Sequence, residues 1–291
     1  MLEIIFIIAL VSLVIGSISD LKTYEIPDWL NFSLIAVGVG VNAIYSLSTQ
    51  NYIYIIECLV GLAFSVALAY LMFYTGQWGG GDSKMIMGLG AIIGLPFKIT
   101  YMSFLSYFYI NIAFIGALYG FIWIISYLLF NLKKVFKRTK LKLKKTKLVR
   151  YIVYGFTIIS IALVYFMPES AIDPIFKYFA YSMIFFIFST FFIWVVVKSI
   201  EEVCMIKKVA PEKLTEGDWI VKDIKIDGKR ICGPKDLGIE RKQIDQLIKF
   251  KKQKKITYVT IKNGIPFVPS FLFAFVYTII FNNIIFLSMI V

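Results

Sequence analysis

Long apolar segments, separated by short polar connections, run through most of the chain. A helix needs about 20 apolar residues to cross the hydrocarbon layer of a bilayer, which is roughly 30 Å thick. Eight segments meet or approach that length, at about 1–19, 29–48, 52–75, 83–97, 101–131, 151–168, 175–198 and 265–290. The fourth segment is short and the fifth is long. The pattern therefore predicts about eight transmembrane helices, within a range of six to nine.

One polar region interrupts this pattern, between about residues 200 and 262. Residues 219–226 are followed by Asp227-Gly228, a pair that suits the tight turn of a β-hairpin. Apolar residues then recur at helical spacing over 239–248, and 256–261 has the alternation of a strand. The region is therefore predicted to form a small β-β-α-β insert.

The expected fold class is an all-α polytopic membrane protein with a small cytoplasmic α+β insert. Its expected parts are a membrane core over 1–130, a basic cytoplasmic loop over 131–150, an additional transmembrane helix pair over 151–199, the insert over 200–262 and a C-terminal transmembrane helix over 263–291.

Composition and charge fit this assignment. Hydrophobic residues make up 59% of the chain and the mean hydropathy is +0.79. The formal net charge is +13, and much of it lies in the basic run over 131–150, which contains no acidic residue. Because cytoplasmic loops are enriched in Lys and Arg, this run is expected inside the cell and both termini outside. We interpret it mainly as a topology signal; binding of anionic lipids at 133–150 is the alternative.

Several kinds of chemistry are excluded or disfavoured. The chain has no histidine, which excludes Ser-His-Asp catalysis and His-ligated zinc. Its three cysteines are scattered, without a CxxC pair. We therefore expect neither a metal nor a cofactor. The basic insert has no aromatic stacking platform interleaved with its basic residues, so nucleic-acid binding is not expected.

Two carboxylates have an unusual placement. Asp20 ends the first apolar segment and Asp82 precedes the fourth, so the topology puts both at the cytoplasmic edge. A pair of carboxylates can hydrolyse an amide if one activates water while the other, protonated, binds the carbonyl oxygen. Asp82 is in an N-cap-like position, whereas Asp20 is at the end of a helix, where the dipole disfavours an anion. We therefore expect Asp20 to be protonated first.

The residues around the two carboxylates also suggest a site. Gly79, Gly80 and Gly81 directly precede Asp82 and can adopt a positive φ or let a substrate backbone approach closely. Pro27 fixes φ just before the second helix, and the neighbouring Asp28 could cap that helix.

The segments SISDLKTYEIPD, from Ser17 to Asp28, and GGGDSK, from Gly79 to Lys84, resemble the two motifs of type IV prepilin peptidases. These are membrane aspartic proteases of the GxGD class, and the resemblance covers about residues 1–130. It implies that Asp20 and Asp82 are the catalytic pair. The segments 216–220 and 263–269 resemble the archaeal branch, which includes preflagellin (prearchaellin) peptidases and archaeal prepilin peptidases.

The resemblance also implies a substrate. Such enzymes remove short basic leader peptides from type IV pilin-like or archaellin preproteins at the cytoplasmic membrane face. Glu25 and Asp28 could attract the basic leader. Lys84 matches a basic position of the family; it is expected to hold Asp82 ionised, to contact a substrate carbonyl, or simply to extend toward the membrane surface. The chain lacks the CxxC pairs of the bacterial enzymes that also methylate, so we expect peptidase activity alone.

Other functions remain as alternatives. An ion- or proton-coupled transporter could use the same carboxylates, but the chain has no evident internal repeat. A presenilin-like intramembrane protease shares the GxGD element, although the Ile-Pro-Asp segment after Asp20 favours the prepilin type. A non-enzymatic scaffold for filament assembly is disfavoured by the Gly-rich turn before Asp82.

Overall fold

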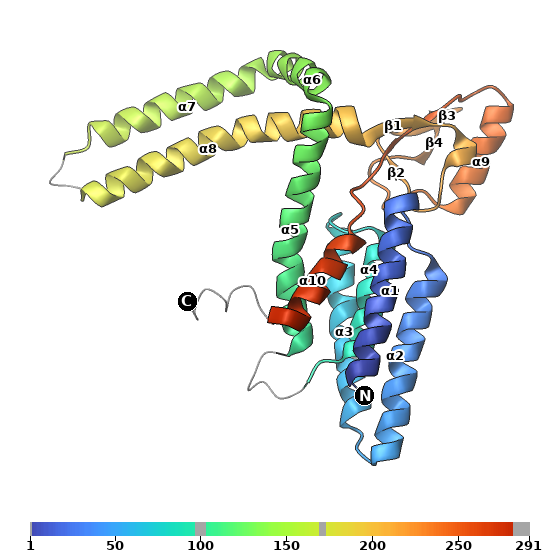
Figure 1. The fold of residues 1–291 in the computed structure, drawn as a ribbon. Helices are drawn as coiled ribbons and strands as arrows, with labels where there is room; N and C mark the ends of the chain where they lie inside the picture. Colours follow the sequence, from blue (N-terminus) through green and yellow to red (C-terminus); the bar gives the residue numbers. More distant parts are fainter. Residues whose placement is uncertain (1, 97–102, 169–172, 282–291) are drawn as a thin grey trace. The chain divides into compact units, whose positions relative to one another are not determined.

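The computed structural model describes residues 2–96, 103–168 and 173–281. The chain divides into two compact units (Figure 1). Unit 1 comprises residues 1–123 and 208–291, and unit 2 comprises residues 124–207. Helices dominate both units, and all strands belong to the polar region that follows residue 205.

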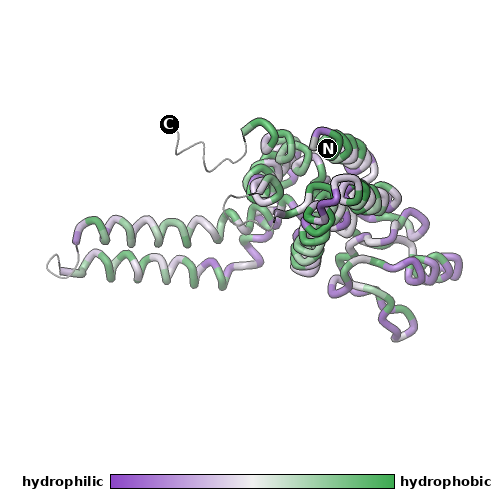
Figure 2. Tube along the Cα trace, turned by 90° about the horizontal axis from the view of Figure 1, so that it is seen from below, coloured by the Kyte–Doolittle hydropathy of each residue, from purple (hydrophilic) through white to green (hydrophobic). Residues whose placement is uncertain are grey.

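Within the described residues, six helices are long and apolar enough to cross a membrane. They are α1 (Leu2–Thr23), α2 (Asp28–Thr49), α3 (Ile53–Tyr74), α5 (Phe104–Phe130), α7 (Lys147–Tyr165) and α8 (Pro174–Ile200). Two shorter helices, α4 (Gly80–Ile93) and the apolar α10 (Val268–Phe281), lie in the other two predicted spans. The end of the last predicted span, 282–291, lies outside the described residues. The polytopic architecture is thus supported by six long helices, and Figure 2 shows that the long helices are coloured mainly as hydrophobic.

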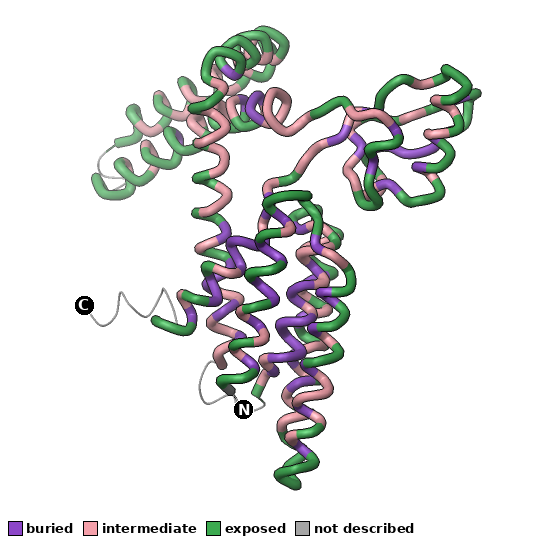
Figure 3. The backbone as a smooth tube through the Cα atoms, turned by 45° about the vertical axis from the view of Figure 1, so that its right-hand side comes forward, coloured by how far each residue is buried: buried purple, intermediate pink, exposed green. Residues whose placement is uncertain are grey.

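The core of unit 1 is formed by α1, α2, α4, α5 and α10 around a continuous apolar cluster. Figure 3 shows the buried residues concentrated along the inner sides of these helices. Helices α3 and α4 approach closely because Gly61 and Gly90 face each other: a Cβ on either one would overlap the other's carbonyl oxygen. Large core side chains fill the remaining space, among them Leu13, Met85, Ile86, Leu89, Phe108, Phe271 and Phe275. This packing fixes α4, and therefore the turn before it.

The polar region folds as a small α+β insert with its own apolar core. Its elements are β1 (Ile206–Val209), β2 (Trp219–Ile220), β3 (Ile224–Ile226), β4 (Lys229–Cys232), α9 (Arg241–Lys252) and β5 (Val259–Lys262). β3 and β4 form the predicted hairpin: both turn residues, Asp227 and Gly228, have positive φ, as the type I′ turn requires. The predicted helix is also confirmed, as α9.

The strand pattern differs from the prediction in two ways. The single strand expected over 219–226 is divided, because β2 pairs with β5 while β3 pairs with β4. The sheet containing β5 also includes β1, which we did not predict, in the order β1-β5-β2. One stretch of chain therefore contributes to two sheets, which alternation alone does not reveal.

Unit 2 contains α6 (Leu132–Lys145), α7, α8 and the π-helical turn η1 (Glu201–Met205). The segment over 131–150, expected as a loop, is therefore helical over most of its length. It contains neither Gly nor Pro, and its many lysines are good helix formers. Helix α7 has no buried residue. An apolar helix so exposed is typical of a lipid-facing surface.

Candidate active site

Asp20 lies in the last turn of α1 and its side chain is buried. Its Oδ2 accepts a hydrogen bond from the backbone N–H of Val268, at 2.9 Å. Val268 is the first residue of α10, so the donor is one of the N–H groups that have no partner within their own helix. Asp20 is therefore at the carboxyl end of one helix and at the amino end of another.

Asp82 lies in the first turn of α4, at its third residue, and is half-buried. The N-cap residue is Gly79, so the N-cap-like position expected for Asp82 is wrong by three residues. Its Oδ2 nevertheless accepts a hydrogen bond from the Gly79 N–H, at 3.0 Å. This bond closes the turn and orients the carboxylate at the start of the helix.

The glycines before Asp82 matter for space and not for backbone conformation. None of Gly79, Gly80 and Gly81 has a positive φ, so that part of the prediction is wrong. A Cβ on Gly81 would lie 3.2–3.3 Å from three side-chain atoms of Ile26, tighter than ordinary contact. A Cβ on Gly80 would meet only Phe73, at 3.9 Å. The close approach of the turn to the segment before α2 therefore favours glycine at position 81, since a larger residue would have to move Ile26.

Asp20 and Asp82, 62 residues apart in the chain, belong to the same compact unit, and the helices that carry them pack together: a Cβ on Gly16 of α1 would meet Met85 of α4 and Val268 of α10. The negative charge of Asp20 lies within electrostatic range of Asp82. Asn31 of α2 approaches the same turn: its Nδ2 donates to the carbonyl oxygen of Gly81 at 3.5 Å. Aromatic rings from two elements pack beside it, since Trp78 meets Phe271 edge to face at 5.3 Å. Each carboxylate thus lies at the start of a helix, Asp20 at α10 and Asp82 at α4, and the Trp78–Phe271 contact joins these two helix starts.

The other predicted site residues have other partners. Lys84 forms an ion pair with Asp28 at 2.6 Å, joining α4 to α2, and its ammonium lies over the ring of Phe32. Neither partner is deeply buried. Pro27 is the N-cap residue of α2, and no side-chain cap bond is made there. The interpretation of Asp28 as the helix cap is therefore wrong.

Glu25 is exposed, and its backbone oxygen accepts hydrogen bonds from Ser19 and Thr23. The insert reaches the same region of unit 1. Burial raises the pKa of Asp218 above its usual value, and the negative charge of Glu25 raises it further. Trp219 packs against Gly76, in the turn between α3 and α4. Glu25 and Asp218 are therefore close enough for their negative charges to interact.

Sequence reasoning missed three contributions. The first is the backbone N–H of Val268: the sequence indicated its segment, 263–269, but not its hydrogen bond to Asp20. The other two are buried polar atoms at helical spacing from the motif carboxylates: Ser17 Oγ, one turn before Asp20, and Asn31 Oδ1, one turn after Asp28. Neither atom has a hydrogen-bond partner among residues 2–96, 103–168 and 173–281. Burial of an unpartnered polar group is unfavourable, so Ser17 Oγ and Asn31 Oδ1 are candidates for a hydrogen bond to water or to a substrate group.

The expectation that the site works without a metal ion has not been tested. In the part of the chain that the structure describes, no three His, Cys, Asp or Glu side chains are grouped as metal ligands. The expectation of a metal-free site is therefore still a prediction.

Comparison with known proteins matches the part of the chain that contains Asp20 and Asp82. Residues 7–125 match the family model of the type IV leader peptidase family. A preflagellin peptidase from Methanocaldococcus jannaschii is 37% identical over 108 residues, which cover 36% of this chain and 46% of that protein. The preflagellin peptidase of Methanococcus voltae is 35% identical over 88 residues, covering 30% of this chain and 37% of that protein.

A third preflagellin peptidase, from Methanococcus maripaludis, is also 35% identical over 88 residues, 30% of this chain and 38% of that protein. The chain therefore spans less than half the length of each of these relatives. No solved structure gives a significant match. The expected resemblance, including its archaeal preflagellin branch, is confirmed for the segment that contains both motifs.

Proposed function

Because residues 7–125 match the type IV leader peptidase family, we propose that the protein is a membrane aspartic endopeptidase. It removes the short leader peptides of preflagellin-like or other type IV pilin-like preproteins. The observation that carries the proposal is the placement of Asp20 and Asp82, each from one of the two motifs, on packed helices of one compact unit, within electrostatic range of each other. The names of the relatives, which are preflagellin peptidases, support the substrate class.

The proposed mechanism uses the carboxylate pair alone. Two carboxylates that share one catalytic site do not both ionise readily, so the proposed pair holds one proton between its two members. The ionised member takes a proton from water, which attacks the scissile carbonyl carbon. The protonated member donates a hydrogen bond to the carbonyl oxygen and then a proton to the departing amine. No covalent enzyme intermediate forms.

The surroundings of Asp20 change the expected division of roles. The end of α1 disfavours an anion, which had suggested that Asp20 is protonated first. The N-terminus of α10, however, supplies Asp20 with a backbone donor from Val268, and such bonds are stronger to a charged acceptor. Asp20 is therefore proposed as the ionised member and Asp82 as the proton donor. Infrared titration of the Asp20→Asn variant follows the carboxyl group of Asp82, and titration of the Asp82→Asn variant follows that of Asp20. The assignment would be reversed if Asp82 lost its proton at the lower pH.

The substrate is proposed to enter from the cytoplasm. The basic segment over 131–150 favours the cytoplasmic side for the connections that follow α1, α3, α5 and α8, with both termini outside. Glu25 and Asp218 then present negative charge to the basic leader that the family resemblance implies. Asp28 contributes less, because Lys84 already neutralises it.

Mapping the cleavage site tests the proposal. Detergent-solubilised protein is incubated with a preflagellin and, separately, with a pilin-type precursor, and the new N-terminus is read by mass spectrometry. We expect cleavage between a basic leader and the apolar helix that follows, and the preferred precursor identifies the subfamily. Cleavage inside the apolar helix would favour a presenilin-like protease. A folded protein that cleaves neither precursor would contradict the proposal and favour the transporter alternative.

A further inference from the structure

Helix α6 connects two helices that are candidate membrane spans, α5 and α7, with single residues, Asn131 and Thr146, at the joints. It has 14 residues and is therefore about 21 Å long. Eight of the residues are Lys or Arg and none is acidic. A helix in this position lies within reach of the membrane surface, whichever way its neighbours cross.

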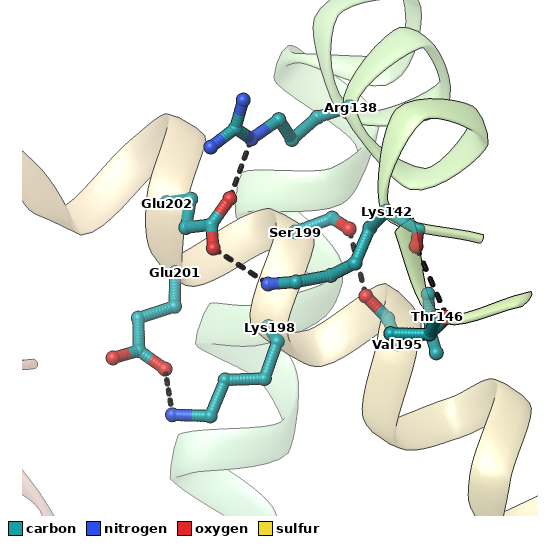
Figure 4. A network of polar contacts seen from close by, with 8 residues as sticks. All are labelled: Arg138, Lys142, Thr146, Val195, Lys198, Ser199, Glu201 and Glu202. Carbon is teal, nitrogen blue, oxygen red and sulfur yellow. Dashed lines mark hydrogen bonds and ion pairs between the residues drawn. The ribbon is translucent and has the colours of Figure 1, made fainter. Parts of the chain in front are cut away.

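One face of α6 is held by the protein. Val135 is buried, and Thr139 and Lys142 follow it at helical spacing. Arg138 and Lys142 both bind the carboxylate of Glu202, in the π-helical turn after α8, at 2.5 and 2.6 Å (Figure 4). A single buried edge and a shared carboxylate thus fix the rotation of α6 about its own axis within unit 2.

The opposite face carries a row of lysines. The positions 133, 137, 140 and 144 repeat at intervals of four, three and four, which places them along one line of a helix. We call Lys133, Lys137, Lys140 and Lys144 the lysine strip; all four are exposed. None of them has an ion-pair partner within residues 2–96, 103–168 and 173–281.

Like charges four residues apart destabilise a helix, so the strip is unfavourable unless anions neutralise it. We infer that the lysine strip binds the headgroups of anionic lipids. The length and straightness of the strip fit a row of headgroups at a bilayer surface, and each lysine near such a surface gains attraction. The exposed apolar side chains Phe136 and Leu141 flank the strip, as in helices that lie in the membrane interface. This inference does not depend on the proposed peptidase activity.

Lysine footprinting of the full chain tests it. The protein is placed in nanodiscs of phosphatidylglycerol or of phosphatidylcholine, and the rate of reductive methylation of each lysine is followed by mass spectrometry. We expect the strip lysines to react about threefold or more slowly in phosphatidylglycerol, and the difference to disappear at high salt. Four exposed lysines of the insert, Lys225, Lys229, Lys235 and Lys242, serve as internal controls and should change little.

A charge-matched pair of variants completes the test. Changing the four strip lysines to Gln should reduce the phosphatidylglycerol retained after purification, measured by native mass spectrometry. Changing the four control lysines to Gln removes the same charge and should leave retention near the wild-type level. Equal methylation rates in the two lipids would overturn the inference. So would equal lipid loss in the two variants.

Discussion

The backbone bond from Val268 to Asp20 offers a sharp test of how α10 contributes to the site. Replacing Val268 by proline removes the N–H donor that lies 2.9 Å from Asp20 Oδ2. Proline is well tolerated at the first position of a helix, where Val268 stands. The helix should therefore persist while Asp20 loses this donor.

The expected loss follows from the strength of the bond. A hydrogen bond to a charged group contributes about 1.5–3 kcal/mol, and about 1.4 kcal/mol corresponds to a factor of ten in rate. We therefore expect kcat to fall about tenfold to a hundredfold in Val268→Pro, with little change in KM, because the bond stabilises the catalytic group and not the bound leader.

The control is Val268→Ala, which also removes the buried side chain but keeps the N–H group. Cleavage of a preflagellin peptide is measured for both variants, with thermal unfolding to verify that each is folded. The reasoning predicts near-normal kcat for Val268→Ala. If the two folded variants lose the same activity, the side-chain packing of Val268 matters and the backbone bond does not.

Two further predictions concern the turn before α4 and its ion pair. Gly81→Ala should lower both the melting temperature and kcat, because a Cβ must displace Ile26, which costs about 1–3 kcal/mol of stability and shifts the turn that holds Asp82. Gly80→Ala, whose Cβ has room, should stay close to wild type in the same peptide assay, and equal losses would refute the packing argument. Asp28→Asn breaks an exposed ion pair with Lys84, which contributes about 0–1 kcal/mol. The melting temperature should therefore fall by only a few degrees, and loss of the folded state would contradict this prediction.

Much of the fold could be predicted because each long helix has its own apolar segment. Helix α6 was missed because its charge concealed the spacing of Val135, Thr139 and Lys142, which marks the face that packs. The strand β1 was missed because it pairs with β5, about 50 residues later. Local patterns predict an element, whereas pairing between distant strands depends on the whole fold.

In the candidate site, too, local features could be predicted and distant contacts could not. Each motif is a short segment of sequence, so the sequence alone indicated Asp20 and Asp82. The partner of Asp20 is 248 residues away and the partner of Lys84 is 56 residues away. Only the packing of α10 and α2 brings these groups into contact. The helix-dipole argument for Asp20 therefore considered α1 alone, whereas the N-terminus of α10 also acts on this carboxylate.

The central claim is that Asp20 and Asp82 work as one catalytic unit. It is tested most directly by comparing kcat/KM for preflagellin cleavage in Asp20→Asn, Asp82→Asn and the double variant, with Asp245→Asn, an exposed carboxylate of α9, as control. Groups that act together are not additive. We predict that either single change abolishes most activity, that the double variant is no worse than either, and that the control is active. Two small, independent losses that multiply in the double variant would contradict the account.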